Sequence, residues 1–312
     1  MLLVNNQDIS QAVYSISYSD TLNNGPSALE WALPPAQAAG FKNGDTVAFV
    51  HNGVPVFYGF LFRIDCSVDE TRCTAYDQLR YLKSELPLLR QTETLTDFVS
   101  RVLAQAGDRI RIGAVAGTDV KLAQKLFDNT SYLDMLYQSM AETTELTNMR
   151  FCFRDEFGAV ALRGLDTLYS GIVIGDDSLA VDFKHSLAIG DNACNYVKVA
   201  RDSGQEGLRS AVVAQNSALI ARWGRLSAFR QMTQGNDAQL QSLANSLLKE
   251  RSREEETLAL DCIGDLRIRA GSSFRLSISQ LGTDFTALIK SATHSFFGQA
   301  HTMKLEVERY PA

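Results

Sequence analysis

The stretch "TRCTAYDQLRYLKSELP", Thr71 to Pro87, marks the point where one kind of structure ends and another begins. Its first residues are typical of a β-strand, and Asp77 follows at once, before Leu79 and Leu82. An aspartate there predicts a helix N-cap, because its carboxylate can accept hydrogen bonds from the amides of the first turn. The final proline ends the helix. We therefore interpret the stretch as the end of a β domain rather than a catalytic cluster, and expect Leu79, Tyr81 and Leu82 to pack back on that domain.

Upstream of this stretch, residues 45–76 predict a three-stranded β-meander. The strands are "DTVAFV", "VPVFYGFLFRID" and "RCTAY", separated by turns at "HNG" and "SVDET". Aromatic and β-branched residues dominate the strands, whereas Gly, Asn and acidic residues mark the turns. The segments "YSISYSD" and "SALEWALP" add two earlier strands. The N-terminal region is therefore predicted to be an all-β domain.

Nearly the same layout returns near the C-terminus. Gly271 begins "SSFRLSIS", "QLGTD" turns the chain, and the strands "FTALIKSATHSFF" and "HTMKLEVER" follow. Gly44 to Tyr76 and Gly271 to Val307 thus share the order glycine, medium strand, turn, long strand, polar tip and alternating strand. We interpret this as an internal duplication at long period. The alternative is that two unrelated β-meanders look alike.

Helical patterns lie between and within these β regions. Thr94 is the expected N-cap of "LTDFVSRVLAQ", and "TSYLDMLYQSMAETT" is a second helix with one apolar face. The hairpin "MRFCFRDEFGAVALRGL" follows. The sequence therefore predicts an α+β, mainly β chain with three domains: a β domain over 1–88, a middle α+β domain over 89–172, and a second β domain over 173–312. The last contains an inserted helix at about 236–252, capped by Asn236 or Asp237.

Composition and charge exclude several classes of function. The 312 residues carry a net charge of −6, and no run of Lys or Arg is long enough to follow a phosphate backbone. Sequence-specific binding of nucleic acid is therefore not expected. The first residues, "MLLVNNQDIS", lack the features of a signal peptide, and no segment approaches eighteen consecutive apolar residues. We expect a chain without a membrane anchor that is assembled in the bacterial cytoplasm.

No arrangement of residues predicts chemistry. The sequence contains no Gly-rich phosphate loop, His-Glu-x-x-His, Gly-x-Ser-x-Gly or Cys-x-x-Cys motif. The four histidines are scattered, which favours surface or strand-end positions over metal ligands. We expect no catalytic, cofactor-binding or metal-binding residues, no cofactor and no enzymatic activity.

The five cysteines are an odd number, which favours reduced thiols. If the turn of the first meander is Asp69-Glu70, Cys66 and Cys73 lie directly opposite each other. Two packed thiols are favoured there over a cross-strand disulfide.

A short segment, "ARWGRLSAFRQ", is the main candidate for an interface. Trp223 lies between Arg222 and Arg225, and tryptophan and arginine are enriched in the residues that dominate binding energy at protein interfaces. The alternative is that Trp223 completes the core of its own domain.

Three dispersed motifs carry a resemblance to a known family. They are "TAYDQLRYLK" at Thr74 to Lys83, "RWGRLSAF" at Arg222 to Phe229, and "GDLRIRAGSSF" at Gly264 to Phe274. In this order and spacing they resemble the XkdQ/YqbQ-type baseplate hub proteins of contractile phage tails, defective prophages and phage-tail-like bacteriocins. The likeness runs over almost the whole chain. Asp77, Gly264 and Gly271 are the expected structural positions.

The resemblance implies a fold, a function and partners. The two β domains would be tube-like β-barrels with the small α+β domain inserted between them. Three copies would form a ring that joins a threefold spike to a sixfold tail tube, as a symmetry adaptor in the baseplate of a virion or tail-like particle. The implied partners are the chain itself as a homotrimer, the central spike protein, the tube initiator or tube protein, a LysM-type tail protein and the tape measure protein.

Three rival interpretations are kept open. A type VI secretion spike would add a Gly-rich β-helical needle, which this sequence lacks. A tail-associated peptidoglycan hydrolase would need a catalytic constellation in the middle domain. A distal tail protein of a non-contractile phage is also a ring-forming β protein, but the middle domain and the three motifs favour the contractile-type hub.

Overall fold

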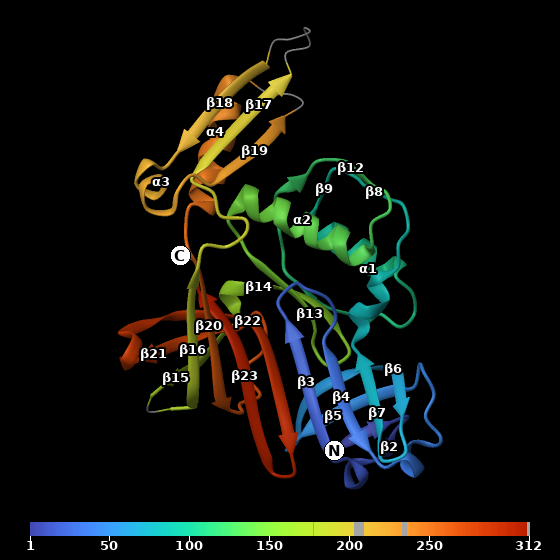
Figure 1. The fold of residues 1–312 in the computed structure, drawn as a ribbon. Helices are drawn as coiled ribbons and strands as arrows, with labels where there is room; N and C mark the ends of the chain where they lie inside the picture. Colours follow the sequence, from blue (N-terminus) through green and yellow to red (C-terminus); the bar gives the residue numbers. More distant parts are fainter. Residues whose placement is uncertain (177, 203–208, 233–235, 311–312) are drawn as a thin grey trace. The chain divides into compact units, whose positions relative to one another are not determined.

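The computed structural model describes residues 1–176, 178–202, 209–232 and 236–310 (Figure 1). Its contacts divide the chain into two compact units. Unit 1 comprises Met1–Lys184 and Leu258–Ala312, and unit 2 comprises His185–Thr257. The three predicted domain boundaries do not coincide with this division and stay a prediction.

The first β region of unit 1 contains seven strands that pair in the order β3-β4-β7-β6-β5-β1-β2. Its core is formed by apolar side chains such as Trp31, Phe57 and Leu61. The predicted meander and the two earlier strands are all present. The strands are β1 (Leu2–Val4), β2 (Gln7–Asp8), β3 (Ser15–Thr21), β4 (Ala28–Leu33), β5 (Thr46–His51), β6 (Val54–Cys66) and β7 (Thr71–Tyr76), with 3-10 helices η1 (Ser10–Ala12) and η2 (Pro35–Ala38).

The second β region of unit 1 is built around the predicted C-terminal meander. Its core contains Phe274, Ile289 and Leu305. β21 pairs with β22, β22 with β23, and β23 with β20, all antiparallel. The elements are β15 (Tyr169–Gly175), β16 (Ala180–Ala188), β20 (Glu255–Ile263), β21 (Ser273–Ile278), β22 (Thr283–Phe297) and β23 (Ala300–Arg309), with η4 (Leu165–Thr167) and η5 (Ser279–Leu281).

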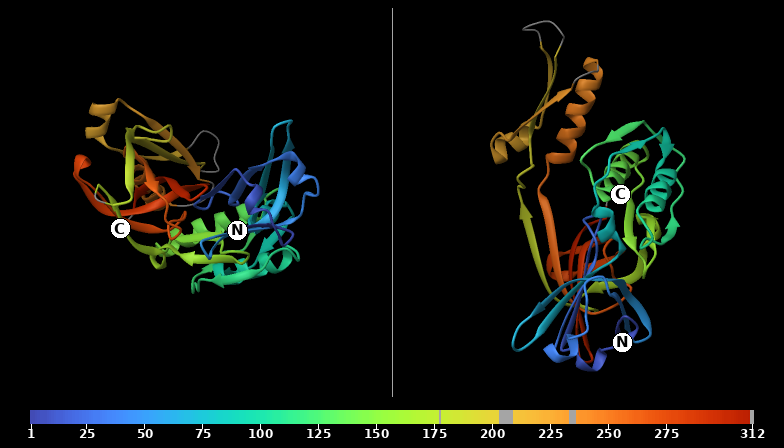
Figure 2. Two further views of the ribbon diagram at one scale, coloured as in Figure 1. Left: turned by 90° about the horizontal axis from the view of Figure 1, so that it is seen from below. Right: turned by 90° about the vertical axis from the view of Figure 1, so that its right-hand side faces the viewer.

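The two β regions belong to one 13-stranded sheet, because β22 also pairs with β3. Seen from below, the blue strands of the first region and the red strands of the second lie side by side (Figure 2). The mainly β, α+β class is confirmed. The described strands do not close into two barrels, however: the sheet runs on through β22 and stays open at β2 and β16. The middle region therefore separates the β regions in sequence but not in the sheet.

The middle α+β region has its own core, in which two helices cover short strands. Thr94 caps α1, as predicted, and Ser131 caps α2. β13 and β14 form the predicted hairpin, and β10 joins it in parallel to β14. The elements are β8 (Leu88–Arg90), β9 (Glu93–Thr94), α1 (Leu95–Gln105), β10 (Ile112–Val115), β11 (Lys121–Leu122), β12 (Lys125–Phe127), α2 (Tyr132–Thr147), β13 (Phe151–Asp155) and β14 (Val160–Gly164).

The stretch after β7 forms the 3-10 helix η3 (Gln78–Lys83), and the Asp77 carboxylate accepts the Leu79 N–H as the predicted N-cap. One part of the expectation is wrong. Leu79 and Leu82 are buried in the core of the middle α+β region, not in the first β region. Only Tyr81 packs back, with its ring 5.3 Å from that of Phe60. Because successive side chains of a short helix point in different directions, η3 contributes to both neighbouring regions.

The predicted pairing of Cys66 with Cys73 is also wrong. Cys66 lies opposite Thr71, and Cys73 lies opposite Ile64. The loop between β6 and β7 is closed by a hydrogen bond from Ser67 N–H to the Glu70 carbonyl, 2.9 Å, so the turn is centred earlier than assumed. All five cysteines are free.

The internal duplication is visible in the backbone of the two meanders. Gly44 donates its N–H to the Leu61 carbonyl at 2.7 Å, and Leu61 donates back to the residue after Gly44 at 2.8 Å. Gly271 and Ile289 repeat this exchange at 2.9 and 3.0 Å. Both glycines have positive φ, +95° and +83°. The same reciprocal contact therefore starts β5 against β6 and β21 against β22.

A β-bulge follows at the equivalent place in both long strands. The register of β6 against β7 shifts between Leu61 and Arg63, and that of β22 against β23 shifts between Ile289 and Ser291. Bulges bend a strand at a defined position and are designed features rather than defects. The shared glycine contact, strand order and bulge make the two meanders structural repeats. β4 and β20 are equivalent too, since each pairs with the last strand of its meander.

The two equivalent glycines give a matched pair for substitution. Gly44→Ala is expected to lower the free energy of unfolding by about 1 kcal/mol, because φ is positive. Gly271→Ala is expected to lower the free energy of unfolding by about 2–4 kcal/mol, because overpacking adds to the backbone strain. The new Cβ would lie 2.5 Å from Cys152 Sγ, whereas nothing lies closer than 3.8 Å to a Cβ at position 44. Urea unfolding of both variants measures the difference. Cys152→Ala in the Gly271→Ala background should recover part of the loss, and equal losses would contradict the crowding.

Unit 2 is a small α/β unit, and its last helix is the one element of it that was predicted from the sequence. β17 pairs with β18 antiparallel and with β19 in parallel. Leu240 and Ala244 of α4 are buried with Val197 and Val199 of β17. Asn236 caps α4 in a capping box with Gln239. The elements are β17 (Tyr196–Asp202), β18 (Arg209–Gln215), α3 (Ser217–Trp223), β19 (Ser227–Met232) and α4 (Asp237–Arg251).

Among the helices of the described residues, none is both long enough and apolar enough to cross a membrane.

Candidate functional site

One row of side chains crosses both repeats on the exposed side of the shared sheet. Residues directly opposite each other in antiparallel strands place their side chains on the same face, so the strand registers define the row. It runs across β23, β22, β3, β4, β7 and β6 through Thr302, Ser295, Ser17, Glu30, Thr74 and Arg63. These six residues include no large apolar side chain, and on β20 the register continues the row to the exposed Ile263. Together with the neighbouring Asp65, Arg72, Asp261 and Lys304, we call it the hydrophilic face.

The hydrophilic face carries both signs of charge. Arg63 lies 2.5 Å from Asp65, and Lys304 lies 3.5 Å from Asp261. These pairs are exposed and therefore contribute little to stability. Across the join of β3 and β22 the face forms a hollow of about 590 Å³ that Glu30, Arg72 and Phe297 help to line. A surface of polar groups and paired charges interacts well with water, although the exposed Phe297 and Ile263 add two apolar side chains to it.

The row beneath the hydrophilic face faces the core. His294 of β22 lies opposite Tyr18 of β3, and Tyr18 lies opposite Leu29 of β4. All three are buried. The join between β22 and β3, which we call the seam, is therefore packed on one side and hydrophilic on the other. It fixes the hydrophilic surfaces of the two repeats in one continuous sheet.

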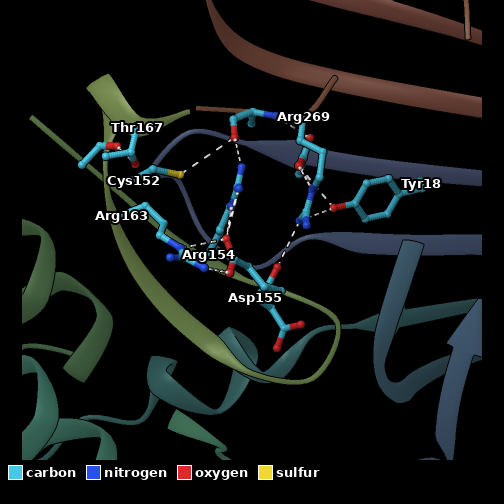
Figure 3. Close-up of polar contacts among 11 residues, drawn as sticks. Tyr18, Cys152, Arg154, Asp155, Arg163, Thr167 and Arg269 are labelled. Atoms are coloured by element: carbon cyan, nitrogen blue, oxygen red, sulfur yellow. Dashed lines mark hydrogen bonds and ion pairs between the residues drawn. The ribbon is translucent and has the colours of Figure 1, made fainter. Parts of the chain in front are cut away.

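Arg269 lies at the seam and links all three sequence regions of unit 1 (Figure 3). Its guanidinium donates to the Tyr18 hydroxyl at 2.6 Å, to the Asp20 carboxylate at 3.2 Å and to the Asp155 backbone carbonyl at 3.2 Å. Asp20 also accepts the Ala270 N–H at 3.2 Å. Burial lowers the pKa of Arg269, but Tyr18 and Asp20 outweigh it and raise the pKa overall. Arg269 thus links β3, the β13–β14 hairpin and the segment before β21 through an ion pair and hydrogen bonds.

A second polar group beside Arg269 fixes the hairpin (Figure 3). Glu156 accepts from Arg154 at 3.1 Å and from Arg163 at 2.7 Å. Arg154 also donates to the Ala270 carbonyl at 3.4 Å. Burial raises the pKa of Glu156, but the hydrogen bonds from the two arginines outweigh it, so its pKa lies below the usual value. The hairpin is therefore tied to the segment that carries Arg269.

Asp77 and Asp155 are buried acids near the seam. Asp77 accepts from the Ser27 N–H at 2.9 Å, from the Ser27 hydroxyl at 2.5 Å and from the Leu79 N–H at 2.9 Å. Asp155 accepts from the Gly158 N–H at 2.6 Å and from Gln78 at 2.9 Å. Burial, and then the charge of Asp155, raises the pKa of Asp77 to about 7. Burial likewise raises the pKa of Asp155 to about 6.

Three of the four histidines are not scattered, contrary to expectation. His294 and His301 are joined ring to ring, Nδ1 to Nε2, at 2.9 Å, and the His51 ring centroid lies 5.5 Å from that of His301. Burial and the two neighbouring histidines lower the pKa of His301 to about 4. Gly264 leaves room for this ring, because a Cβ there would lie 2.2 Å from His301 Cγ. These side chains come together only through the pairing register of the strands, which cannot be inferred from the sequence.

His51 and His301 border a pocket of about 570 Å³ that Asp265 and Arg267 also line. Within the part of the chain that the structure describes, no group of three or more histidine, cysteine, aspartate or glutamate side chains could hold a metal ion.

The predicted interface residues lie in unit 2, at the end of α3. Arg222 is exposed and lies 3.2 Å from Glu254. The Arg225 guanidinium lies over the Tyr196 ring, 3.7 Å from its centroid. Trp223 is half-buried, and its indole N–H is buried without a hydrogen-bond partner. The arginines are thus held by neighbours of their own unit, and a role in an interface stays a prediction.

The fold of this chain is similar to that of phage tail proteins of known structure. A crystal structure of a prophage MuSo2 43 kDa tail protein from Shewanella oneidensis matches with a TM-score of 0.72 at 12% identity, over 99% of this chain and 97% of that one. The E. coli c3393 protein matches with a TM-score of 0.53 at 11% identity, over 100% of this chain and 77% of that one. It is described as a type VI secretion component with structural similarity to T4 tail proteins gp27 and gp5.

The chain belongs to the YQBQ-like family, whose model matches residues 16–308. Two Bacillus subtilis proteins are similar over 85% of this chain. They are the uncharacterized protein YqbQ, at 26% identity over 81% of its length, and the phage-like element PBSX protein XkdQ, at 24% identity over 82% of its length. The family resemblance of the three sequence motifs is therefore confirmed.

Proposed function

We propose that this chain is the structural hub of the baseplate in a contractile phage tail or phage-tail-like particle, such as a bacteriocin. Three copies form a ring that joins a threefold central spike to the sixfold tail tube and lines the central channel. The observation that carries the proposal is the pair of structural repeats held edge to edge in one sheet, with one hydrophilic face across both. A duplicated unit in a trimer presents six similar subdomains to the tube and three identical chains to the spike.

The hydrophilic face is the surface that suits a channel. Its polar side chains and paired charges would give a passing polymer mainly hydrophilic contacts, with no large excess of charge of one sign. The likeness of the E. coli c3393 protein to gp27 and gp5 supports the choice of a hub within the tail proteins. The partners on either side of the ring would be the central spike protein and the tube initiator or tube protein. A LysM-type tail protein and the tape measure protein would contact the same assembly.

The proposed role is structural and includes no enzymatic activity. The buried acids and histidines have partners that fit structural roles, with Asp77 capping η3 and His294 and His301 paired with each other. The rival function is that of a tail-associated peptidoglycan hydrolase. Clearing of cell walls in a zymogram by the purified chain would favour that rival.

The molar mass of the purified chain tests the hub. Light scattering after size exclusion is expected to give three times the 34.4 kDa of one chain for the chain alone. A three-to-three complex with the spike protein would add the mass of three spike chains. A monomer that does not bind the spike would remove the hub function and leave the fold unchanged.

A further inference from the structure

The three-stranded sheet of unit 2 has one covered side and one open side. α4 packs on the side to which Val197 and Val199 of β17 point. Lys198 lies between them in the sequence and points to the other side, where it is directly opposite Val213 of β18 and Phe229 of β19. Lys198 is exposed, and Val213 and Phe229 are 42% and 56% exposed. We call this side the open face of unit 2.

Arg225 lies at one end of the open face, and its hydrogen-bond donors are available to a partner. Its guanidinium lies over the ring of Tyr196, 3.7 Å from the centroid, and Tyr196 precedes Lys198 by two residues on the same side of β17. Within the described part of the chain, Arg225 has no carboxylate or other acceptor. Stacking on an aromatic ring holds a guanidinium in position while its planar set of donors can still bind a carboxylate.

The loop that carries Arg225 is fixed by a fully buried side chain. The Asn195 amide donates to the Gly224 carbonyl at 2.7 Å, and its oxygen accepts the Leu226 N–H at 2.8 Å. Gly224 has φ 76° and ψ 174°, a backbone conformation that is essentially restricted to glycine. Such conformations persist only where the surrounding structure holds them, and they are found preferentially at functional sites. Arg225 is therefore presented by a preorganised loop.

The charge of the open face is opposite to that of the whole chain. The chain carries a net charge of −6, whereas the two charged side chains described on this face, Lys198 and Arg225, are both positive. They flank the exposed apolar surface of Val213 and Phe229, so the complementary surface is acidic and partly apolar. Two cations are too few to follow a phosphate backbone, which favours a protein over a nucleic acid. β19 pairs with β17 alone among the described strands, and its open edge suits an extended segment.

We propose that the open face of unit 2 binds an extended acidic segment of a partner protein, with Arg225 as the anchor for one of its carboxylates. An apolar side chain of the segment packs on Phe229, and a second carboxylate lies near Lys198. The inference goes beyond the proposed function, because the ring and its contacts with the spike and the tube assign no role to this face. It also separates the predicted interface arginines, since Arg225 contacts the partner and Arg222 does not.

Binding of an acidic copolymer to the full-length chain tests this proposal. The probe is a fluorescein-labelled random copolymer of glutamate and tyrosine, and fluorescence anisotropy follows its titration with the protein. We expect saturable binding that weakens as salt is added, because salt screens exposed charges. Arg225→Gln should weaken the binding about tenfold or more, since it removes hydrogen bonds from a charged donor. Lys198→Gln should weaken it to a smaller extent.

Arg222→Gln is the matched control. It removes the same charge from the same segment, but Arg222 lies 3.2 Å from Glu254 and is not part of the open face. This variant should bind the copolymer like the wild type. Equal losses in Arg222→Gln and Arg225→Gln, an unchanged affinity in Arg225→Gln, or no binding of the copolymer by the wild type would each overturn the proposal. Tighter binding of oligothymidylate than of the copolymer would also overturn it, in favour of a nucleic-acid ligand.

Discussion

Arg269→Met is expected to lower the free energy of unfolding of unit 1 by about 3–5 kcal/mol, because removal of one member of a buried ion pair leaves the other charge uncompensated. Asp20 is 8% exposed and would keep only the backbone N–H of Ala270 and the Tyr18 hydroxyl as partners. The substitution also removes the donor to the Asp155 carbonyl. Urea unfolding followed by circular dichroism measures the loss.

Arg275→Met is the control for this prediction. Arg275 forms an even shorter pair with Asp284, 2.7 Å against 3.2 Å, but the two side chains are 57% and 53% exposed. Its loss is expected to change stability by less than about 1 kcal/mol. Adding Asp20→Asn to Arg269→Met should recover part of the loss, because no buried charge is then left without a partner. Similar effects of Arg269→Met and Arg275→Met would mean that the seam does not depend on the buried pair.

Asp77→Asn is expected to remove a pH dependence of stability between about pH 4 and pH 7. Burial and Asp155 raise the pKa of Asp77 from 3.8 to about 7 in the folded chain. Between these values the unfolded chain has lost the proton and the folded chain still holds it. The stabilising contribution of the protonated acid is therefore complete below pH 4 and is lost as the pH rises towards 7. At about 1.4 kcal/mol per pKa unit, the loss is about 2–4 kcal/mol.

The quantity to measure is the difference in unfolding free energy between the wild type and Asp77→Asn at pH 4.5 and pH 7.5. Taking the difference cancels the contribution of His294 and His301 to the pH dependence. Their pKa values are lowered in the folded chain, so they reduce its stability as the pH falls, which is opposite to the effect of Asp77. The wild type should lose stability relative to the variant as the pH rises. A difference that is constant with pH, or that grows in favour of the wild type, would show that Asp77 is ionised throughout and acts only as a cap.

The sequence predicted those parts of the fold that depend on local patterns. The meanders, the helices and their caps follow from strand alternation, helical periodicity and single residues such as Thr94 and Asn236. The duplication could be predicted because a glycine begins each repeat, Gly44 in the first and Gly271 in the second. β17 to β19 were not predicted, although "YVKVARD" and "RSAVVAQ" have the alternation and β-branched residues of strands.

The seam could not be predicted, because it joins residues from opposite ends of the sequence. Nothing local to β3 indicates that residues 291–296 pair with it. For the same reason the histidine cluster and the Arg269 network were missed: each depends on a register between distant strands. The error on Cys66 and Cys73 has a smaller cause, a loop centred earlier than assumed, and in a strand such a shift changes every pairing.

The position of β22 in the sequence has a consequence for synthesis. β3 leaves the ribosome long before its partner at the seam, because residues 16–21 pair with residues 291–296. Until β22 has been made, the nascent first repeat carries an exposed strand edge on β3. Unpaired edges on folding intermediates promote aggregation. The time between the two events is therefore when the cell's chaperones are most needed by this protein.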